Sequence, residues 1–401
     1  MRVVMRVVMR SGAAVAGIAC ASLLGASWNV GPIGLAASPV ILTLWRRAPT
    51  RKQAWCVVVS YYAGAAAPTL LGLVGRGYGD VSTAELAACV FGGAALMASV
   101  WSALWSSRLL DNSVSSSLRI ALLLCLTALP GIGTVGVASP LTAAGLWLAG
   151  LGWWGLVIHT GALTVCTRDA RTLLAWALLA TASGVASSQA EALDTHGMLG
   201  RPTHLDVAAL GDFAGQYRTA MGAQRAADAI PDDAEVVVLG EGLGGLWTSA
   251  MQSLWQAERT SARSATLIVG TTLPVYRAPG RLQYEAAAMI LRPDGSVRSV
   301  RQRVPMPLVL WRPWREDGAY RAHWWEPGTA QAGGETVGVI ICYEQLLVFP
   351  VLTSLAAGAR VLIGLSNTRE LGTEYVARWQ QTSLRAWARL FGVPWVLATN
   401  S

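Results

Sequence analysis

The residue of this sequence best suited to chemistry is Cys342, which lies within the run GVIICYE (338–344). Its apolar start predicts a buried strand, and we expect a helix to follow from Gln345 towards Ala357. Cys342 would then lie at a strand-to-helix elbow, near the positive end of a helix dipole, where a thiolate is favoured. The sequence therefore indicates a reactive thiol. The alternative is a buried structural cysteine.

A second candidate is Glu241, which ends the apolar run VVVLG (236–240). The carboxyl ends of strands line the active crevice of many layered α/β proteins, so we expect Glu241 to face the same crevice as Cys342. A carboxylate that is partly shielded from water can accept the proton of a thiol. The structural alternative is a helix cap or an ion-pair partner.

The other cysteines and the histidines show no spacing typical of a metal site. We therefore expect neither a metal nor another cofactor. Five cysteines fall in apolar segments, where a free cysteine is usually a small buried hydrophobic residue: Cys20, Cys56, Cys89, Cys125 and Cys166.

The composition predicts a membrane protein, because 53% of the 401 residues are hydrophobic and only 13% are charged. Residues 1–189 carry 12 basic and 4 acidic residues, whereas residues 190–401 carry 19 of each. The positive charge therefore belongs to the apolar half. Direct nucleic-acid binding is not expected, because the polar half has no net positive field.

The apolar half predicts an α-helical bundle in a lipid bilayer, with about seven spans. If the N-terminus is cytoplasmic, 11 basic residues lie in cytoplasmic segments and Arg76 alone lies in a loop on the other side. This predicts a multi-pass protein of the bacterial inner membrane whose C-terminal half is periplasmic. The alternative for residues 1–28 is a cleaved signal peptide. The candidate spans are 12–28, 31–45, 54–74, 84–106, 119–138, 141–165 and 172–189.

Residues 190–401 predict a separate α/β domain, because buried strands alternate with helices. The sequence RPDG (292–295) predicts a hairpin turn. Strands are expected at 235–241, 265–273, 284–291, 297–303, 338–342, 360–365 and 394–399, and helices at 207–229, 246–259, 345–357 and 373–390.

This half resembles the nitrilase, or carbon–nitrogen hydrolase, superfamily. The similar segments are VVVLGE (236–241), YEAAAMILRPDG (284–295), GVIICYEQ (338–345), LIGLSNTREL (362–371) and VLATNS (396–401). The resemblance implies an α-β-β-α sandwich, truncated at its C-terminal end because family members continue with further strands.

The resemblance also implies a Glu–Lys–Cys triad, with Glu241 as general base and Cys342 as the nucleophile that forms a thioester. The backbone N–H of Tyr343 would help to form an oxyanion hole, with Glu344 beside it. The family lysine is missing, because the only lysine is Lys52, in a predicted cytoplasmic loop. Arg303, or alternatively Arg301, is the candidate replacement; either could stabilise an oxyanion but could not exchange a proton.

In length and layout the chain is similar to the TraB family of conjugal transfer proteins and, more distantly, to apolipoprotein N-acyltransferases. These resemblances imply three alternatives: a membrane-anchored amidase or acyltransferase, a catalytically degenerate component of a conjugation envelope complex, or a lipoprotein N-acyltransferase. The implied partners are the lipid bilayer and envelope proteins of a conjugation system. The sequence does not indicate the substrate.

Overall fold

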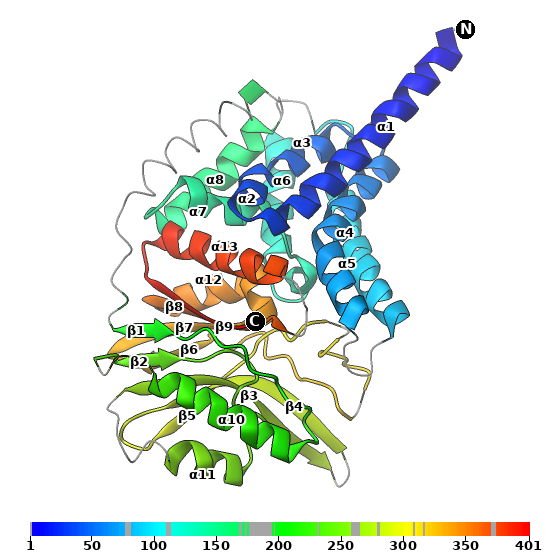
Figure 1. Cartoon of the computed structure of the whole chain (residues 1–401). Coiled ribbons are helices and arrows are strands. Elements are labelled where there is room, and N and C mark those ends of the chain that lie inside the picture. The colour runs from blue at the N-terminus through cyan, green and yellow to red at the C-terminus, as the bar shows by residue number, and fades with distance from the viewer. Residues whose placement is uncertain are drawn as a thin grey trace. The chain divides into compact units, whose positions relative to one another are not determined.

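The structure is a computed structural model (Figure 1) that divides into two compact units, residues 1–191 with 385–392 and residues 192–384 with 393–401. It describes residues 2–76, 82–109, 114–167, 171–172, 175, 195, 197–229, 231, 233–257, 265–278, 281–307, 309–315, 317–369 and 374–401.

The first unit is a set of apolar helices of unequal length. Its main helices are α1 (Arg2–Ala26), α2 (Pro32–Ala37), α3 (Val40–Arg46), α4 (Arg51–Arg76), α5 (Thr83–Leu104), α6 (Val114–Thr127), α7 (Ala144–Trp147) and α8 (Gly152–Cys166). Helices α1 and α4 approach closely at two glycines: a Cβ on Gly25 would lie 1.9 Å from the Tyr61 carbonyl oxygen, and one on Gly64 would lie 2.3 Å from that of Ser22. Small residues allow this close packing, as in many membrane helix pairs.

The described residues include two helices that are long and apolar enough to cross a membrane, 51–74 and 83–104. A third span is present if the pair 140–147 and 152–165, bent by 118°, counts as one. The predicted bundle of about seven spans is therefore not confirmed. The predicted second span is divided between α2 and α3, because Pro39 lies between them. The predicted span 172–189 lies almost wholly outside the described residues.

The second unit contains two β-sheets with a shared core. Its elements in chain order are β1 (Met198–Gly200), α10 (Phe213–Asp228), β2 (Val236–Val238), α11 (Ser249–Ala257), β3 (Thr266–Ala278), β4 (Arg281–Leu291), β5 (Val297–Arg301), β6 (Thr329–Ala332), β7 (Glu335–Ile341), α12 (Phe349–Ala356), β8 (Val361–Asn367), α13 (Glu374–Phe391, of which residues from Arg385 on belong to the first unit) and β9 (Trp395–Asn400). The strand orders are β1-β2-β3-β4-β5 and β6-β7-β8-β9.

Alternation along the strands determines which side chains enter the core between the sheets. In β7, Val337, Val339 and Ile341 join a buried cluster with Val236 and Ile268 of the other sheet. This is the two-residue period expected of strands. The same apolar core therefore positions the strands that lead to Glu241 and to Cys342.

Helices cover the outer face of each sheet. Helices α10 and α11 share a buried cluster with Val237 and Val269, on the opposite face of the five-stranded sheet. On the four-stranded sheet, Gly338 leaves room for Ser354 of α12, and Gly364 leaves room for Leu384 of α13. Figure 1 shows this order of helices and sheets within the second unit. The predicted α/β architecture of this half is present, and the predicted hairpin is confirmed by the antiparallel pairing of β4 with β5.

Candidate active site

Cys342 lies in a tight turn directly after β7. Its φ is +50°, in the left-handed region that non-glycine residues rarely adopt. A five-residue 3₁₀ turn, Cys342–Leu346, follows, and α12 begins only at Phe349. The predicted helix is present as α12, but it begins at Phe349 and not at Gln345. Pro350 is suited to the first turn of a helix and so marks where α12 begins.

Glu241 reaches this turn from the other sheet. Its backbone N–H donates to the Ser366 carbonyl at the end of β8, at 3.3 Å. Gly270 of β3 makes the position possible, because a Cβ there would lie 2.4 Å from the Glu241 Cα. The Cys342 thiol is hydrogen-bonded to the Glu241 carboxylate. The structure thus brings together the two strand-end residues that the sequence singled out.

The surroundings of Cys342 hold its proton on the sulfur. Burial raises the pKa of the Cys342 thiol well above its ordinary value, and the charge of Glu241 and its hydrogen bond raise it further. The backbone N–H groups of Tyr343 and Asn367 act in the opposite direction but are weaker. The expectation of a helix-stabilised thiolate is therefore wrong. The short 3₁₀ turn has too few aligned peptide dipoles to stabilise a thiolate strongly. Burial and the Glu241 carboxylate therefore determine the direction in which the pKa of Cys342 shifts.

Arg303 and Glu344 form a buried ion pair beneath the turn. The exposed fractions of their side chains are 0% and 1%, and Nη2 of Arg303 lies 3.1 Å from Oε2 of Glu344. The Glu344 carboxylate also accepts the backbone N–H groups of Ile341 at 3.0 Å and Val304 at 3.1 Å. Glu344 therefore joins the Cys342 turn to the segment that follows β5.

The guanidinium of Arg303 has acceptors for all of its N–H groups. Besides Glu344, it contacts the Ser354 hydroxyl at 2.8 Å and the carbonyl oxygens of Val339, Pro327 and Pro350 at 2.9, 3.2 and 2.7 Å. A guanidinium carries five N–H donors, and these partners occupy them. The prediction that Arg303 replaces the missing lysine is therefore wrong, because no donor remains for an oxyanion at Cys342.

Arg301, the alternative replacement, belongs to a different charged cluster. It forms ion pairs with Glu326 and, at 3.8 Å, with Glu285. His323 and Arg321 also contact the Glu285 carboxylate, at 3.0 and 3.2 Å. The hydrogen bond from His323 is the largest of the effects that lower the pKa of Glu285. The guanidinium of Arg301 is therefore paired with the carboxylates of Glu285 and Glu326.

Sequence reasoning missed three groups around the turn. Nε2 of Gln380, on α13, lies 4.0 Å from the Cys342 sulfur, and the backbone N–H of Asn367 also reaches that sulfur. Gln302 donates to the Ile341 carbonyl at 3.0 Å. Asn367 could have been found, because it follows the predicted strand 360–365 and lies in the segment SNTREL (366–371). Nothing distinguished Gln380 from the other polar residues of its helix. In the described part of the chain, no cluster of His, Cys, Asp and Glu could hold a metal.

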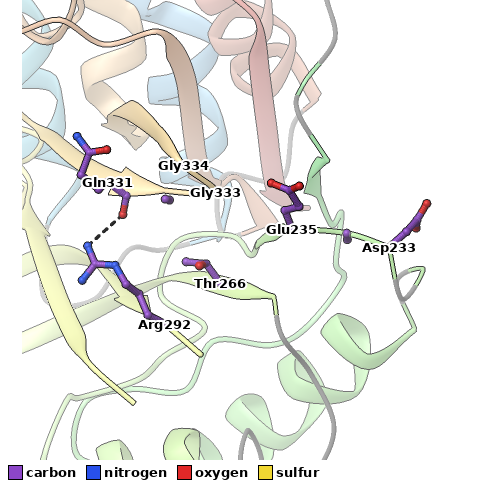
Figure 2. A pocket seen from close by; sticks show the side chains of 9 residues that line it. Asp233, Glu235, Thr266, Arg292, Gln331, Gly333 and Gly334 are labelled. Atoms are coloured by element: carbon purple, nitrogen blue, oxygen red, sulfur yellow. Dashed lines mark hydrogen bonds between the residues drawn. The ribbon is translucent and has the colours of Figure 1, made fainter. Parts of the chain in front are cut away.

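A separate cleft of about 520 Å³ lies at the opposite ends of the strands (Figure 2). It is lined by polar side chains of Glu235, Thr266 and Arg292 and by the turn Gly333–Gly334. In Figure 2 the Arg292 guanidinium points to the Gln331 carbonyl oxygen, to which it donates at 3.1 Å. Because β7 begins beside this cleft and Cys342 follows the other end of β7, the cleft is distinct from the thiol site.

Comparison with solved structures identifies members of the nitrilase superfamily. An amidase of this superfamily from Nesterenkonia AN1 matches with a TM-score of 0.34 and 17% identity, over 51% of this chain and 74% of the other. A carbon–nitrogen hydrolase from Helicobacter pylori G27 matches with a TM-score of 0.38 and 17% identity, over 51% and 72%. No protein-family model matches the chain.

Two curated proteins match along almost the whole chain. Conjugal transfer protein TraB of Agrobacterium fabrum is 29% identical over 408 residues, covering 95% of this chain and 93% of that protein. A probable conjugal transfer protein TraB of Sinorhizobium fredii is 30% identical over 404 residues, covering 94% and 97%. The similarity therefore includes both the helical and the α/β unit, and this chain belongs to the TraB family.

Proposed function

We propose that this protein takes part in conjugal plasmid transfer as a membrane-anchored component, and that its C-terminal unit cleaves or transfers an acyl group through Cys342. Full-length similarity to conjugal transfer proteins supports the first part. The observation that carries the second part is the hydrogen bond between the Cys342 thiol and the Glu241 carboxylate at a left-handed turn.

In the proposed reaction, the Cys342 sulfur attacks the carbonyl carbon of an amide while Glu241 accepts the thiol proton. The concerted transfer suits a thiol whose pKa is raised, because no free thiolate has to form first. Collapse of the tetrahedral intermediate breaks the C–N bond, and the amine leaves with the proton from Glu241. A thioester remains on Cys342.

The second half of the reaction returns the enzyme to its starting state. Water or an acceptor amine attacks the thioester, Glu241 accepts a proton from that nucleophile, and the Cys342 sulfur leaves and regains the proton. The backbone N–H groups of Tyr343 and Asn367 already point at the sulfur. They are neutral donors beside the position where an oxyanion would form. Because the family lysine is missing, these N–H groups have to stabilise the negative charge of the tetrahedral intermediate.

Plasmid transfer in Cys342→Ala and Cys342→Ser strains tests this proposal, with membrane levels of the protein measured in parallel. We expect both variants to lower transfer, because neither forms a thioester under these conditions. Mass spectrometry of the Cys342 peptide after exposure to an activated acyl donor provides the chemical test. Unchanged transfer at equal protein levels, together with no acyl adduct in the wild type, would remove the enzymatic part.

A second function is favoured by one specific observation, the full occupation of Arg303 by structural contacts. This half of the sequence has no lysine, and among the described residues no cationic side chain acts on the pKa of Cys342. In this alternative the unit is a catalytically degenerate component that binds envelope proteins of the conjugation system. Wild-type transfer by Cys342→Ala, combined with loss of transfer on deletion of residues 192–401, would favour it.

For localisation, we propose a multi-pass inner-membrane protein with a cytoplasmic N-terminus and a periplasmic C-terminal unit. The apolar helices 51–74 and 83–104 and the basic loop residues support a membrane location. Alkaline phosphatase and green fluorescent protein fusions after residue 401 test the orientation. Phosphatase activity without fluorescence is expected, and the reverse would place the C-terminal unit in the cytoplasm.

A further inference from the structure

Gln380 places its side-chain amide beside the Cys342 sulfur. The residue is 1% exposed, and its Nε2 lies 4.0 Å from the Sγ of Cys342. The carbonyl oxygen Oε1 is bonded to the same carbon as Nε2, so both atoms belong to the amide group that faces the site. This oxygen accepts no hydrogen bond from any described residue.

A buried carbonyl oxygen without a donor is costly, and it lowers the affinity of a site for any ligand that fails to supply one. Three other buried glutamines, Gln224, Gln302 and Gln345, also have an unpaired Oε1. Their amide nitrogens, however, donate to backbone carbonyl oxygens: that of Leu254 at 3.3 Å for Gln224, that of Ile341 at 3.0 Å for Gln302 and that of Leu365 at 3.0 Å for Gln345. Of these four glutamines, only Gln380 has its amide nitrogen directed at the sulfur.

We propose that Gln380 is a specificity-determining residue that accepts a hydrogen bond from an N–H group on the carbonyl compound attacked by Cys342. The ligand class is a carboxamide or N-substituted amide, in preference to an ester. The inference rests on the proposed acyl-transfer site and specifies its substrate class. It also assigns the amide nitrogen of Gln380 a role in positioning the sulfur.

The test uses two alkylating probes of nearly equal size, chloroacetamide and methyl chloroacetate. In each reaction the Cys342 sulfur displaces chloride from the methylene carbon and the thiol proton passes to Glu241 or water. Only the amide carries an N–H donor. The ratio of the two rate constants cancels changes in the nucleophilicity of the sulfur, which affect both probes alike.

The rates are measured on the full chain in detergent, by mass spectrometry of the Cys342 peptide, and N-acetylcysteine gives the intrinsic ratio. Relative to that reference, we expect the wild type to favour the amide by about fivefold or more, the effect of one hydrogen bond to a buried acceptor. Gln380→Met should abolish this preference. Gln380→Glu keeps an acceptor and should retain the preference even if both rates fall. Gln381→Met, at an exposed neighbouring position of α13, is the matched control and should not alter the ratio.

A wild-type ratio equal to that of N-acetylcysteine would overturn the inference, as would an unchanged ratio in Gln380→Met. If Gln380→Met fails to fold, a Gln380→Glu ratio equal to the N-acetylcysteine reference overturns it independently. These outcomes are separate from failure of the proposed function, which is decided by the acyl adduct and by plasmid transfer in the Cys342 variants.

Discussion

Arg303 and Glu344 form a fully buried ion pair, 3.1 Å apart, between the segment after β5 and the turn that carries Cys342. The same carboxylate accepts the backbone N–H groups of Ile341 and Val304. The pair therefore fixes where β7 ends and the reactive turn begins. An arginine that could be taken for a catalytic cation instead determines the geometry of the site.

Removing one member of this pair should be strongly destabilising. Arg303→Met leaves Glu344 charged, buried and partly unpaired, and we expect the free energy of unfolding to fall by about 3–5 kcal/mol. The urea midpoint of the C-terminal unit, followed by pulse proteolysis of the detergent-solubilised chain, measures the loss. Arg369→Met is the matched control, because the Arg369–Asp206 pair is largely exposed and should be worth less than about 1 kcal/mol. Equal effects of the two substitutions would contradict the structural role of Arg303.

Glu241→Gln should change two reactivities of Cys342 in opposite directions. The charge and the hydrogen bond of Glu241 raise the pKa of the thiol, so their removal lowers it and increases the thiolate fraction at any fixed pH below that pKa. Alkylation by iodoacetamide at pH 8 should therefore become faster. Acyl transfer should become slower by about 10²–10⁴-fold, because the general base is lost. Glu235→Gln, at the exposed far end of the same strand, should change neither rate.

The pH profile of wild-type alkylation follows from the same pKa. Because the pKa of Cys342 lies well above the ordinary value of about 8.5, the alkylation rate should still rise with pH where an ordinary thiol has reached its plateau. Stopped-time labelling between pH 7 and 10, resolved at the Cys342 peptide, provides the profile. A plateau below pH 8 would show that the pKa of Cys342 is lowered, and it would contradict the rise in pKa that we attribute to burial.

Gly270→Ala should displace Glu241 from the sulfur. The added Cβ would lie 2.4 Å from the Glu241 Cα, and backbone cannot move aside as a flexible side chain can. We expect a loss of about 1–3 kcal/mol in stability from overpacking, together with the faster alkylation predicted for loss of Glu241. Gly211→Ala is the control, because a Cβ there meets nothing within 4 Å. If Gly270→Ala has the stability and the alkylation rate of the wild type, Gly270 and the backbone of Glu241 do not pack closely.

The left-handed turn at Cys342 predicts that a glycine is better tolerated there than an alanine. At φ +50° a side chain costs about 1–2 kcal/mol, and glycine avoids this strain. Cys342→Gly should therefore be at least as stable to urea as Cys342→Ala. In helix α10, Ala223→Gly should lower the free energy of unfolding by about 1 kcal/mol or more, so at this position glycine is less stable than alanine. Lower stability of Cys342→Gly than of Cys342→Ala would mean that the turn is unstrained.

Much of the C-terminal unit was predictable from local patterns. Runs such as VVVLG (236–240) and GVIIC (338–342) are apolar because their strands are covered on both faces, and the turn at 292–295 uses residues that favour a hairpin. The helical unit was predicted less well. Hydropathy reports how apolar a segment is, but not whether it is interrupted, as at Pro39 between α2 and α3.

The sequence by itself determined which residues could react: Cys342, the only cysteine of residues 190–401, and Glu241, each at the end of a buried strand, with no lysine in this half. Only the tertiary structure decided what surrounds the sulfur. Glu241 follows β2, whereas Asn367 and Gln380 belong to β8 and α13, and no spacing in the sequence reveals that all three meet at Cys342. The ionisation of the thiol likewise depends on lost water and a neighbouring charge. Both arise only when the two sheets pack together.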